Sequence, residues 1–374
     1  MTEIKMIFAF TGGGTGGHIY PGLAVAQRLK NLLPCRIFWI GSSEGMDRSI
    51  VEEAGLEFYG IPSGKLRRYF SLRNVSDIFK VAAGFFAARR ILKKEKPVLL
   101  FSKGGFVSVP PSAAASSLKI PVYSHESDLT PGLATRINLR FSEKIFIPYK
   151  ESKSFYSEAI HYKLEISGNP VRMEFHSADS SKGRAFLNVK EGERILLVLG
   201  GSSGSLEINR IIKECLPQLT RHYTVVHQCG SNEGVIPEIC ENYKPYAYLR
   251  DELPHIISAA ELIVCRGGAG TIWECAALKK PMVIIPLRAS GTSRGDQVEN
   301  ARVFEEAGAA INFHNDGDSG NSENLSLSAM AEKLSSLVSG LAADEEKRRS
   351  MAASAIGGII AAEYIAKAVA QRVG

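Results

Sequence analysis

The segment Phe10–Gly22 reads FTGGGTGGHIYPG and places a histidine at the end of a loop of five glycines and one threonine. It follows an apolar run typical of a buried strand and precedes a predicted helix that begins near Pro21. Glycines in this position let the backbone approach a phosphate, and the helix N-terminus favours negative charge. The same dipole disfavours an imidazolium, so His18 is a candidate general base. A purely structural hydrogen-bonding role for His18 is the alternative interpretation.

Gly12, Gly14 and Gly17 also have the Gly-x-Gly-x-x-Gly spacing of dinucleotide-binding loops. A nicotinamide site additionally requires an acidic residue at the end of the second strand, where it binds the ribose hydroxyls. That strand ends in FWIGSSE, so Gly41 occupies the expected position and Glu44 is displaced into the following loop. The sequence therefore disfavours a nicotinamide cofactor.

Two further loops with reactive side chains follow later apolar runs of the first half. SKGGF, Ser102–Phe106, follows one run, and HESD, residues 125–128, follows the next. Because the carboxyl ends of parallel strands meet at one edge of a sheet, these loops and the first glycine loop are expected at the same edge. Glu126 is therefore a second candidate base. Alternatively, Glu126 and Asp128 cap the helix predicted near Pro131.

The second half contains two strand–loop–helix segments of the same kind. Gly200–Ser205 reads GGSSGS, where the hydroxyls of Ser202 and Ser203 add to the backbone N–H donors. Cys265–Thr271 reads CRGGAGT, and Glu274 follows one turn into the predicted helix, where a carboxylate can bind ribose hydroxyls. Tight packing alone is the simpler explanation for one such loop. Two in one domain favour a nucleotide diphosphate as the ligand.

Short apolar runs alternate with amphipathic helical segments along the 374 residues, which predicts an α/β architecture with parallel sheets. A chain of this length is expected to form two domains, and the pattern restarts after a breaker-rich segment at Glu165–Pro170. We therefore expect two Rossmann-like domains. The alanine-rich segment Lys347–Val373 predicts a terminal helix that packs back onto either domain. The predicted strands are Met6–Thr11, Arg36–Ile40, Val98–Phe101, Pro121–Ser124, Lys144–Ile147, Arg194–Leu199, Tyr223–His227, Leu262–Cys265 and Met282–Pro286.

The net charge of +6 is concentrated in one segment. Ten Lys and Arg residues lie between Lys65 and Lys96, with only two acidic residues among them. Aromatic and aliphatic side chains alternate with these cations, a pattern more typical of a membrane-surface element than of a nucleic-acid interface. An anionic membrane surface is therefore the predicted partner, and no nucleic acid is expected. A solvated helix face is the alternative interpretation of the segment.

Other features exclude several classes of protein. No run of about 18 uncharged apolar residues predicts a transmembrane helix, and the N-terminus lacks the pattern of a secretory signal. The six cysteines show no metal-ligand spacing, which favours reduced thiols in a cytosolic protein. Asp316 and Asp318 have the Asp-x-Asp form of a metal-binding pair but lie in a polar, glycine-rich stretch, so no metal site is predicted.

Taken in order, the motifs resemble the MurG family of glycosyltransferases, which add N-acetylglucosamine (GlcNAc) to lipid I to form lipid II in bacterial peptidoglycan synthesis. The resemblance runs across nearly the whole chain. It rests on GGTGGHIYPGLAVA (Gly13–Ala26), KGGFVSVP (Lys103–Pro110), His125-Glu126, GNPVR (Gly168–Arg172), GGSSGS (Gly200–Ser205), CRGGAGTIWE (Cys265–Glu274) and DQVENA (Asp296–Ala301).

The resemblance implies a GT-B architecture, in which two Rossmann-like domains face each other across a deep cleft. It places acceptor and membrane contacts in residues 1–165, joined by a returning C-terminal helix at 353–374, and UDP-GlcNAc mainly in residues 166–352. The implied reaction transfers GlcNAc, with inversion, from UDP-GlcNAc to the 4-hydroxyl of the N-acetylmuramic acid (MurNAc) of lipid I, undecaprenyl-pyrophosphoryl-MurNAc-pentapeptide. No cofactor is implied. The implied location is peripheral, on the cytoplasmic face of the inner membrane.

Carried over by position, the resemblance also assigns roles to individual residues. The reaction also needs a base to take the hydroxyl proton, and His18 and Glu126 are the candidates. The implied substrate-binding residues are Thr15, Gly16 and Gly17 against the donor, Asp128 in place of a donor-binding amide, Arg172 and Ser202 at the nucleotide and phosphates, Leu249 beside the uracil, Ala269, Gly270, Thr271 and Glu274 at the diphosphate and ribose, and Gln297 at the sugar hydroxyls.

The chain departs from the family pattern at two places. Family members commonly have Gln-Asn where this chain has Ser127-Asp128, and an amide or imidazole where it has Asp296. A carboxylate at position 128 near a diphosphate is electrostatically unfavourable. The departures concern sugar recognition rather than the reaction.

Two rival functions are consistent with part of the sequence. A UDP-GlcNAc 2-epimerase of the same architecture would need neither a lipid acceptor nor a basic apolar surface. A non-catalytic protein that binds membranes or nucleic acid would leave the paired glycine loops unexplained.

Overall fold

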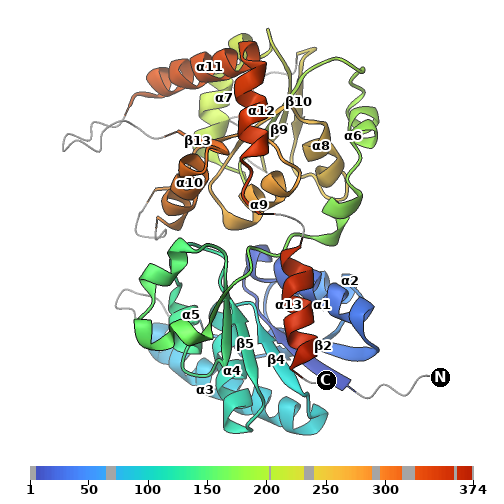
Figure 1. Ribbon diagram of the computed structural model, residues 1–374, viewed down its shortest axis with the longest axis vertical. Helices are drawn as coiled ribbons and strands as arrows, with labels where there is room; N and C mark the ends of the chain where they lie inside the picture. Colours follow the sequence, from blue (N-terminus) through green and yellow to red (C-terminus); the bar gives the residue numbers. More distant parts are fainter. Residues whose placement is uncertain are drawn as a thin grey trace. The chain divides into compact units, whose positions relative to one another are not determined.

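The structure of the protein is a computed structural model that describes residues 6–64, 73–201, 204–230, 240–288, 295–313, 325–357 and 360–372. The chain forms two compact units, Met1–Met173 with Ile359–Gly374, and Glu174–Gly358. Each unit contains one parallel sheet flanked by helices (Figure 1). The units meet after Met173 and after Gly358, whereas the breaker-rich segment predicts the first boundary near Glu165–Pro170 and the resemblance implies breaks after residues 165 and 352.

The sheet of the N-terminal unit has seven parallel strands in the order β3-β2-β1-β4-β5-β6-β7. Phe8 and Phe10 on one face of β1 pack with α1 and with the C-terminal helix α13, whereas Ala9 on the other face packs with α3 and α4. Burial on both faces accounts for the near-continuous apolar runs of these strands. The elements are β1 (Met6–Thr11), α1 (Tyr20–Leu32), β2 (Cys35–Ser42), α2 (Asp47–Glu53), β3 (Glu57–Ile61), α3 (Arg73–Glu95), β4 (Leu99–Ser102), α4 (Val109–Ser117), β5 (Val122–His125), α5 (Leu133–Asn138), β6 (Lys144–Ile147), β7 (Leu164–Ile166) and α13 (Ala361–Gln371).

The sheet of the C-terminal unit has six parallel strands in the order β10-β9-β8-β11-β12-β13. Leu196 and Val198 of β8 belong to a core shared with α7 and α11. The elements are α6 (Ser180–Leu187), β8 (Ile195–Leu199), α7 (Leu206–Leu219), β9 (Thr224–Gln228), β10 (Tyr243–Tyr246), α8 (Leu253–Ala259), β11 (Leu262–Cys265), α9 (Ala269–Ala277), β12 (Met282–Ile284), α10 (Asp296–Glu306), β13 (Ala310–Asn312), α11 (Leu327–Ala343) and α12 (Glu345–Ala353).

The predicted strands are all present, with ends shifted by one or two residues at most. The four strands that the sequence did not predict, β3, β7, β10 and β13, are the edge strands of the two sheets. An edge strand has a single neighbour and stays partly exposed, so it needs no continuous apolar run. In β10, for example, Pro245 and Lys244 interrupt the pattern, and proline is tolerated at an edge because one side of the strand has no ladder to complete.

The alanine-rich segment Lys347–Val373 is helical as predicted, and the structure divides it between two helices. α12 ends at Ala353, and α13 begins at Ala361 and packs against α1 in the N-terminal unit. Within the described ranges, no helix is long and apolar enough to cross a membrane.

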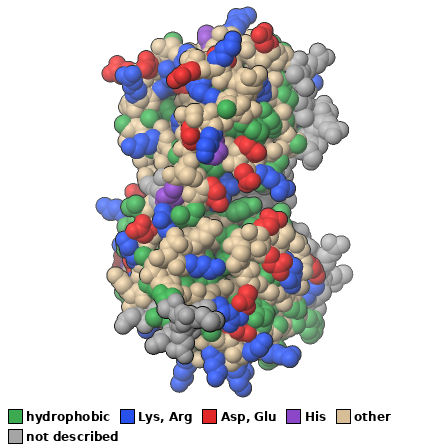
Figure 2. Space-filling view, turned by 90° about the vertical axis from the view of Figure 1, so that its right-hand side faces the viewer, with side chains coloured by type: hydrophobic (Ala, Val, Ile, Leu, Met, Phe, Trp, Pro, Cys, Tyr) green, Lys and Arg blue, Asp and Glu red, His purple; other side chains and the backbone are tan. Residues whose placement is uncertain are grey.

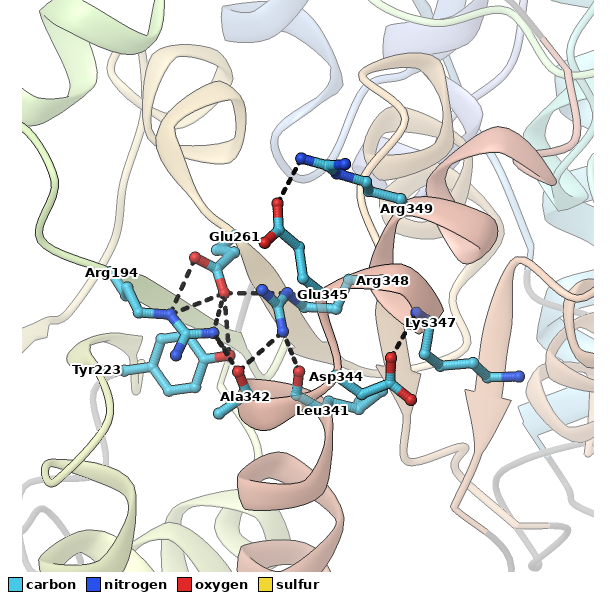
Figure 3. A network of polar contacts seen from close by, with 10 residues as sticks. All are labelled: Arg194, Tyr223, Glu261, Leu341, Ala342, Asp344, Glu345, Lys347, Arg348 and Arg349. Carbon is cyan, nitrogen blue, oxygen red and sulfur yellow. Dashed lines mark hydrogen bonds and ion pairs between the residues drawn. The ribbon is translucent and has the colours of Figure 1, made fainter.

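A charged network ties the amino ends of the central strands of the C-terminal sheet to the last helices of that unit (Figure 3). Glu261, which precedes β11, accepts hydrogen bonds from Arg194 Nε at 3.0 and 3.1 Å and pairs with Arg348 Nε at 3.0 Å. Arg348 also donates to the Ala342 carbonyl at the end of α11. Burial alone would raise the pKa of Glu261, but the two arginines lower it below its usual value. The network lies at the opposite sheet edge from the glycine loops, so we assign it to stability.

Candidate functional site

In both sheets, the point where the strand order reverses lies between strands that are followed by glycine loops. The order reverses between β1 and β4 in the N-terminal sheet and between β8 and β11 in the C-terminal sheet. Ligands of open α/β sheets bind outside the carboxyl ends of the strands at this switch point. The predicted loops leave these four strand ends at Gly12, Lys103, Gly200 and Arg266. Each unit therefore has one candidate ligand site.

The first half of the first glycine loop is held by packing inside the N-terminal unit. Asp47, 1% exposed, accepts hydrogen bonds from the Gly14 N–H at 3.0 Å and from the Ser42 N–H at 2.9 Å. The indole of Trp39 donates to the Gly12 carbonyl at 2.9 Å. A Cβ at Gly13 would lie 1.9 Å from Asp47 Oδ2. These glycines are therefore required by the protein's own packing.

The second half of the loop is open. Gly16–His18 form a single 3-10 turn, η1, with Thr15 at its N-cap. Thr15 and Gly17 are exposed, and a Cβ at Gly17 would meet only Thr15 Oγ1, at 3.8 Å. No steric reason within the described residues requires a glycine at 17. Because Gly17 has no side chain, a ligand has room to approach the backbone here. This is consistent with the substrate contacts expected at Thr15, Gly16 and Gly17.

The imidazole of His18 lies against the second glycine loop. A Cβ at Gly105 would lie 3.0 Å from His18 Cδ2, and a Cβ at Gly104 would lie 3.9 Å from His18 Nδ1. Both glycines have positive φ, +87° at Gly104 and +77° at Gly105, a backbone conformation that side chains disfavour. The second loop thus provides a flat backbone surface for the ring. His18 remains half-buried at the carboxyl edge of the sheet.

Glu126 is a buried helix cap. Its Oε2 accepts hydrogen bonds from the Thr135 hydroxyl at 2.6 Å and from the N–H of Gly132, the N-cap residue of α5, at 3.0 Å. Its Oε1 accepts from the N–H groups of Ser127 at 2.8 Å and Asp128 at 3.2 Å. Burial would raise the pKa of Glu126, but these hydrogen bonds and the charge of Lys103 lower it below its usual value. The geometry therefore favours the capping interpretation of Glu126.

Asp128 and Arg172 lie near the same edge of the N-terminal sheet. Asp128 is half-buried on the turn that Glu126 caps. The Arg172 guanidinium lies 5.3 Å from the centre of the Tyr20 ring, at the start of α1. The segment before Arg172 is tied to the turn, because Asn169 Nδ2 donates to the Ser127 carbonyl at 2.8 Å. His125 Nε2 also donates to the Gly168 carbonyl at 3.0 Å.

In the C-terminal unit, Arg266 joins the two glycine loops. It follows β11, is 9% exposed, and donates from Nη2 to the Ser205 hydroxyl at 2.6 Å. It also donates from Nη1 to the Ile285 carbonyl at 3.0 Å and pairs with Glu207 Oε2 at 2.7 Å. Ser205 caps α7 by accepting from the Ile208 N–H. Ser202 lies outside the described residues, as do Asp316 and Asp318.

The N-terminus of α9 is the candidate anion site of the C-terminal unit. Ala269, Gly270 and Thr271 form its first turn after Gly268, an N-cap residue that makes no side-chain cap hydrogen bond. A Cβ at Gly268 or Gly270 would meet nothing within 4 Å, and Gly270 is exposed. The free N–H groups of this turn are therefore accessible to a phosphate. Glu274, half-buried in the next turn, extends the same site.

Gln297 and Leu249 are partly committed to contacts within the unit. Gln297 Oε1 accepts from the Leu287 N–H at 3.0 Å, so its amide NH₂ is the group left to face a substrate. The Leu249 N–H donates to Gln228 Oε1 at 2.9 Å, and Gln228 Nε2 donates to the Gly201 carbonyl at 3.0 Å. Gln228 thus connects the expected uracil-binding segment to the first glycine loop of this unit.

Four residues that hold the candidate sites in place were not among the predicted site residues: Asp47, Lys103, Gln228 and Arg266. Each lies at a strand end or a helix start, but each has a hydrogen-bond partner that is distant in sequence. Only the position after a predicted strand could have singled out Lys103 and Arg266. Among the described residues, no three His, Cys, Asp or Glu side chains lie together in a way that could hold a metal ion.

Residues 8–147 match the glycosyltransferase family 28 N-terminal domain, and residues 195–357 match the family 28 C-terminal domain. A Treponema denticola protein named UDP-N-acetylglucosamine-N-acetylmuramyl-(pentapeptide) pyrophosphoryl-undecaprenol N-acetylglucosamine transferase is 51% identical over 321 residues, 80% of this chain and 82% of the relative. The chain belongs to glycosyltransferase family 28. A Clostridium perfringens protein with the same name as the T. denticola one is 44% identical to this family 28 chain over 314 residues, 83% of the chain and 85% of that relative.

Solved structures share the fold of this family 28 chain. MurG of Acinetobacter baumannii has a TM-score of 0.71 at 23% identity, covering 98% of this chain and 99% of that one. A putative UDP-N-acetylglucosamine 2-epimerase of Listeria monocytogenes has a TM-score of 0.67 at 12% identity, covering 98% and 96%. At these identities the likeness concerns the fold alone. The predicted GT-B fold with two Rossmann-like domains is confirmed, and so is the prediction of a glycosyltransferase.

Proposed function

We propose that this family 28 enzyme transfers GlcNAc from UDP-GlcNAc to the MurNAc of lipid I and so forms lipid II for peptidoglycan synthesis. The observation that carries the proposal is the 51% and 44% identity, over at least 80% of the chain, to relatives whose names state this transfer. The open first turn of α9 supports a nucleotide diphosphate donor in the C-terminal unit. The loops after β1, β4 and β5 support an acceptor site in the N-terminal unit.

In the proposed reaction, the 4-hydroxyl oxygen of MurNAc attacks the anomeric carbon of GlcNAc. The bond from that carbon to the β-phosphate oxygen breaks, UDP leaves, and the configuration inverts. His18 accepts the hydroxyl proton, since its ring is half-buried at the switch point and held by two loops. Glu126 instead holds the Ser127–Asp128 turn in place, because each of its carboxylate oxygens already accepts two hydrogen bonds.

The leaving diphosphate requires stabilisation of its developing charge. The free N–H groups at the start of α9 and the positive end of its dipole are suited to that task. Gly270 adds no side chain that would block the approach. Glu274 and the amide NH₂ of Gln297 are the groups assigned to ribose and sugar hydroxyls. No cofactor enters this scheme, and the scheme does not require a metal ion.

A UDP-GlcNAc 2-epimerase is the alternative function, and it is supported less well. Its support is fold likeness at 12% identity, far below the identity to the named transferases. The two functions differ in their need for an acceptor. Incubation with UDP-GlcNAc and a soluble lipid I analogue should release UDP and form a disaccharide. Formation of UDP-ManNAc from UDP-GlcNAc alone, with no acceptor-dependent UDP release, would overturn the transferase proposal.

We further infer that α3 docks on an anionic membrane surface, which places the enzyme on the cytoplasmic face of the inner membrane where lipid I would be reached. Phe79 and Phe86 are 72% and 69% exposed on this helix. A surface hollow of about 370 Å³ is lined by Phe86, Arg89, Arg90, Lys93 and Lys94. Figure 2 shows Lys and Arg side chains gathered at one end of the N-terminal unit. The part of the basic segment at residues 65–72 lies outside the described residues.

The cations of α3 are available for such a surface. Within the described part of the chain, Arg89, Arg90 and Lys93 form no ion pair, whereas Lys94 pairs with Glu95 at 3.5 Å. Each unpaired cation near an anionic surface contributes about 1 kcal/mol to binding. Vesicles with phosphatidylglycerol should sediment the protein and zwitterionic vesicles should not. Phe86→Ser should weaken this binding, and Phe186→Ser, at an exposed phenylalanine of α6, should not. Equal loss in both variants would contradict the assignment.

A further inference from the structure

A lysine is buried beside two carboxylates at the carboxyl edge of the N-terminal sheet. Lys103 follows β4 directly, is 1% exposed, and donates from Nζ to the Ser127 hydroxyl at 2.6 Å. Burial lowers the pKa of Lys103 to about 8, and the charges of Glu126 and Asp128 act against that shift. A buried ammonium group is tolerated only where opposite charge compensates it. The two carboxylates on either side of Ser127 supply that charge.

The positive charge of Lys103 in turn offsets the negative charges of Glu126 and Asp128. The charge of Glu126 is distributed over four hydrogen bonds inside the cap, whereas Asp128 is half-buried on the turn, two residues further along the chain. His125, the other titratable group of this strand end, is buried and its pKa is well below 6.5, so it adds no positive charge. Lys103 is a buried cation whose charge interacts with both carboxylates of the Glu126–Asp128 turn. Without it, the carboxylates of Glu126 and Asp128 would repel a diphosphate.

We propose that Lys103 is a positioning residue that holds Ser127 and neutralises Asp128, so that the Ser127–Asp128 turn accepts a diphosphate-bearing substrate. The proposal rests on the proposed function, in which both UDP-GlcNAc and lipid I carry a diphosphate. It also accounts for the departure from the Gln-Asn pair that family members commonly have here. A carboxylate can stand in this place because a lysine from the neighbouring loop balances it.

A double-mutant cycle tests this charge balance. Lys103→Met should raise KM for UDP-GlcNAc or for lipid I by about tenfold with a smaller change in kcat, and the affected KM identifies the diphosphate concerned. In an Asp128→Asn background the same substitution should change that KM by less than about threefold, because no carboxylate is left to neutralise. Lys103→Gln, which keeps a donor but no charge, repeats the cycle if Lys103→Met fails to fold. Lys213→Met removes an exposed lysine of α7 and serves as the matched control.

Equal KM effects of the lysine substitution in both backgrounds, or a loss in kcat alone, would overturn the charge-balance proposal. This failure is distinguishable from failure of the proposed function. If the wild-type protein releases no UDP in the presence of a lipid I analogue, the proposed function is wrong. Calorimetry then measures the Kd for UDP-GlcNAc of the wild type, the two single variants and the double variant. Coupling between the two substitutions in that Kd supports the proposal, and its absence contradicts it.

Discussion

Asp47 Oδ1 accepts a hydrogen bond from the backbone N–H of Gly14 at 3.0 Å, so a residue on α2 holds the glycine loop that follows β1. Asp47 Oδ2 binds the Ser42 N–H at the end of β2. Asp47→Ala leaves both N–H groups without this partner, which should lower the free energy of unfolding by about 2–4 kcal/mol. Turnover should also fall, because the loop carries His18.

Urea unfolding and initial rates measure the two effects of Asp47→Ala separately. Glu53→Ala, at an exposed position of the same helix, is the control and should change the free energy of unfolding by less than about 0.5 kcal/mol. Full stability and full activity of Asp47→Ala would show that the loop holds its conformation without this carboxylate.

His18→Ala tests the assignment of the general base. The substitution should lower kcat by about a hundredfold or more and leave KM for UDP-GlcNAc within about threefold, because the imidazole acts on the acceptor proton. Steady-state rates with a lipid I analogue and calorimetric binding of UDP-GlcNAc provide the two numbers. Unchanged kcat in the folded variant would remove His18 from the mechanism.

Glu126→Gln distinguishes a structural cap from a base. The glutamine amide presents an NH₂ group where the carboxylate accepts hydrogen bonds from Gly132 and Thr135. We therefore expect a lower melting temperature, corresponding to a loss of about 1–3 kcal/mol, together with a partial loss of activity. A variant with wild-type stability and almost no turnover would instead indicate that Glu126 takes part in proton transfer.

The central strands could be predicted from the sequence because burial on both faces requires a continuous apolar run. The edge strands could not be predicted in this way. β3 and β10 pair with one strand only and are partly exposed, so polar and apolar side chains are mixed along them. The glycine loops were predictable for a similar local reason. A cluster of glycines directly after an apolar run indicates a strand end at which the backbone passes close to another part of the chain or to a ligand.

The residues that hold those loops follow from tertiary contacts rather than local pattern. Asp47 and Gly14 are 33 positions apart, and Arg266 and Ser205 are 61 positions apart. Neither pair has a spacing that a helix or a strand would explain. The two interpretations of Glu126 differ only in what surrounds its carboxylate, so the four hydrogen bonds of the folded chain were needed to favour the cap.

Gly17→Ala and Gly13→Ala form a matched pair within the first loop. A Cβ at Gly13 would lie 1.9 Å from Asp47 Oδ2, whereas a Cβ at Gly17 has no neighbour closer than 3.8 Å. Gly13→Ala should therefore lower the melting temperature, and Gly17→Ala should leave it unchanged within about 1 °C, since exposed substitutions have small effects. If a substrate contacts the backbone at Gly17, this alanine should still raise KM. Wild-type kinetics for a stable Gly17→Ala would contradict a substrate contact there.

His227 makes the stability of the C-terminal unit depend on pH. It is fully buried, its Nε2–H donates to Asn209 Oδ1 at 3.1 Å, and its Nδ1 accepts from the Tyr243 hydroxyl at 3.0 Å. Burial lowers the pKa of His227 from 6.5 to about 4. The unfolded chain therefore binds a proton more readily than the folded one. The contribution of neutral His227 is complete above pH 6.5 and is lost as the pH falls from there to about 4, a difference of roughly 3 kcal/mol.

Removing the titratable ring should remove this pH dependence. We expect His227→Phe to be less stable than the wild type at neutral pH, because Asn209 and Tyr243 lose their partner, but to lose less further stability between pH 7 and pH 5. Urea unfolding at the two pH values measures the difference, and His222→Asn, at an exposed histidine, should behave as the wild type. If the acid loss is the same in His227→Phe and the wild type, the buried ring is not the group that titrates, and other buried groups such as His125 must account for it.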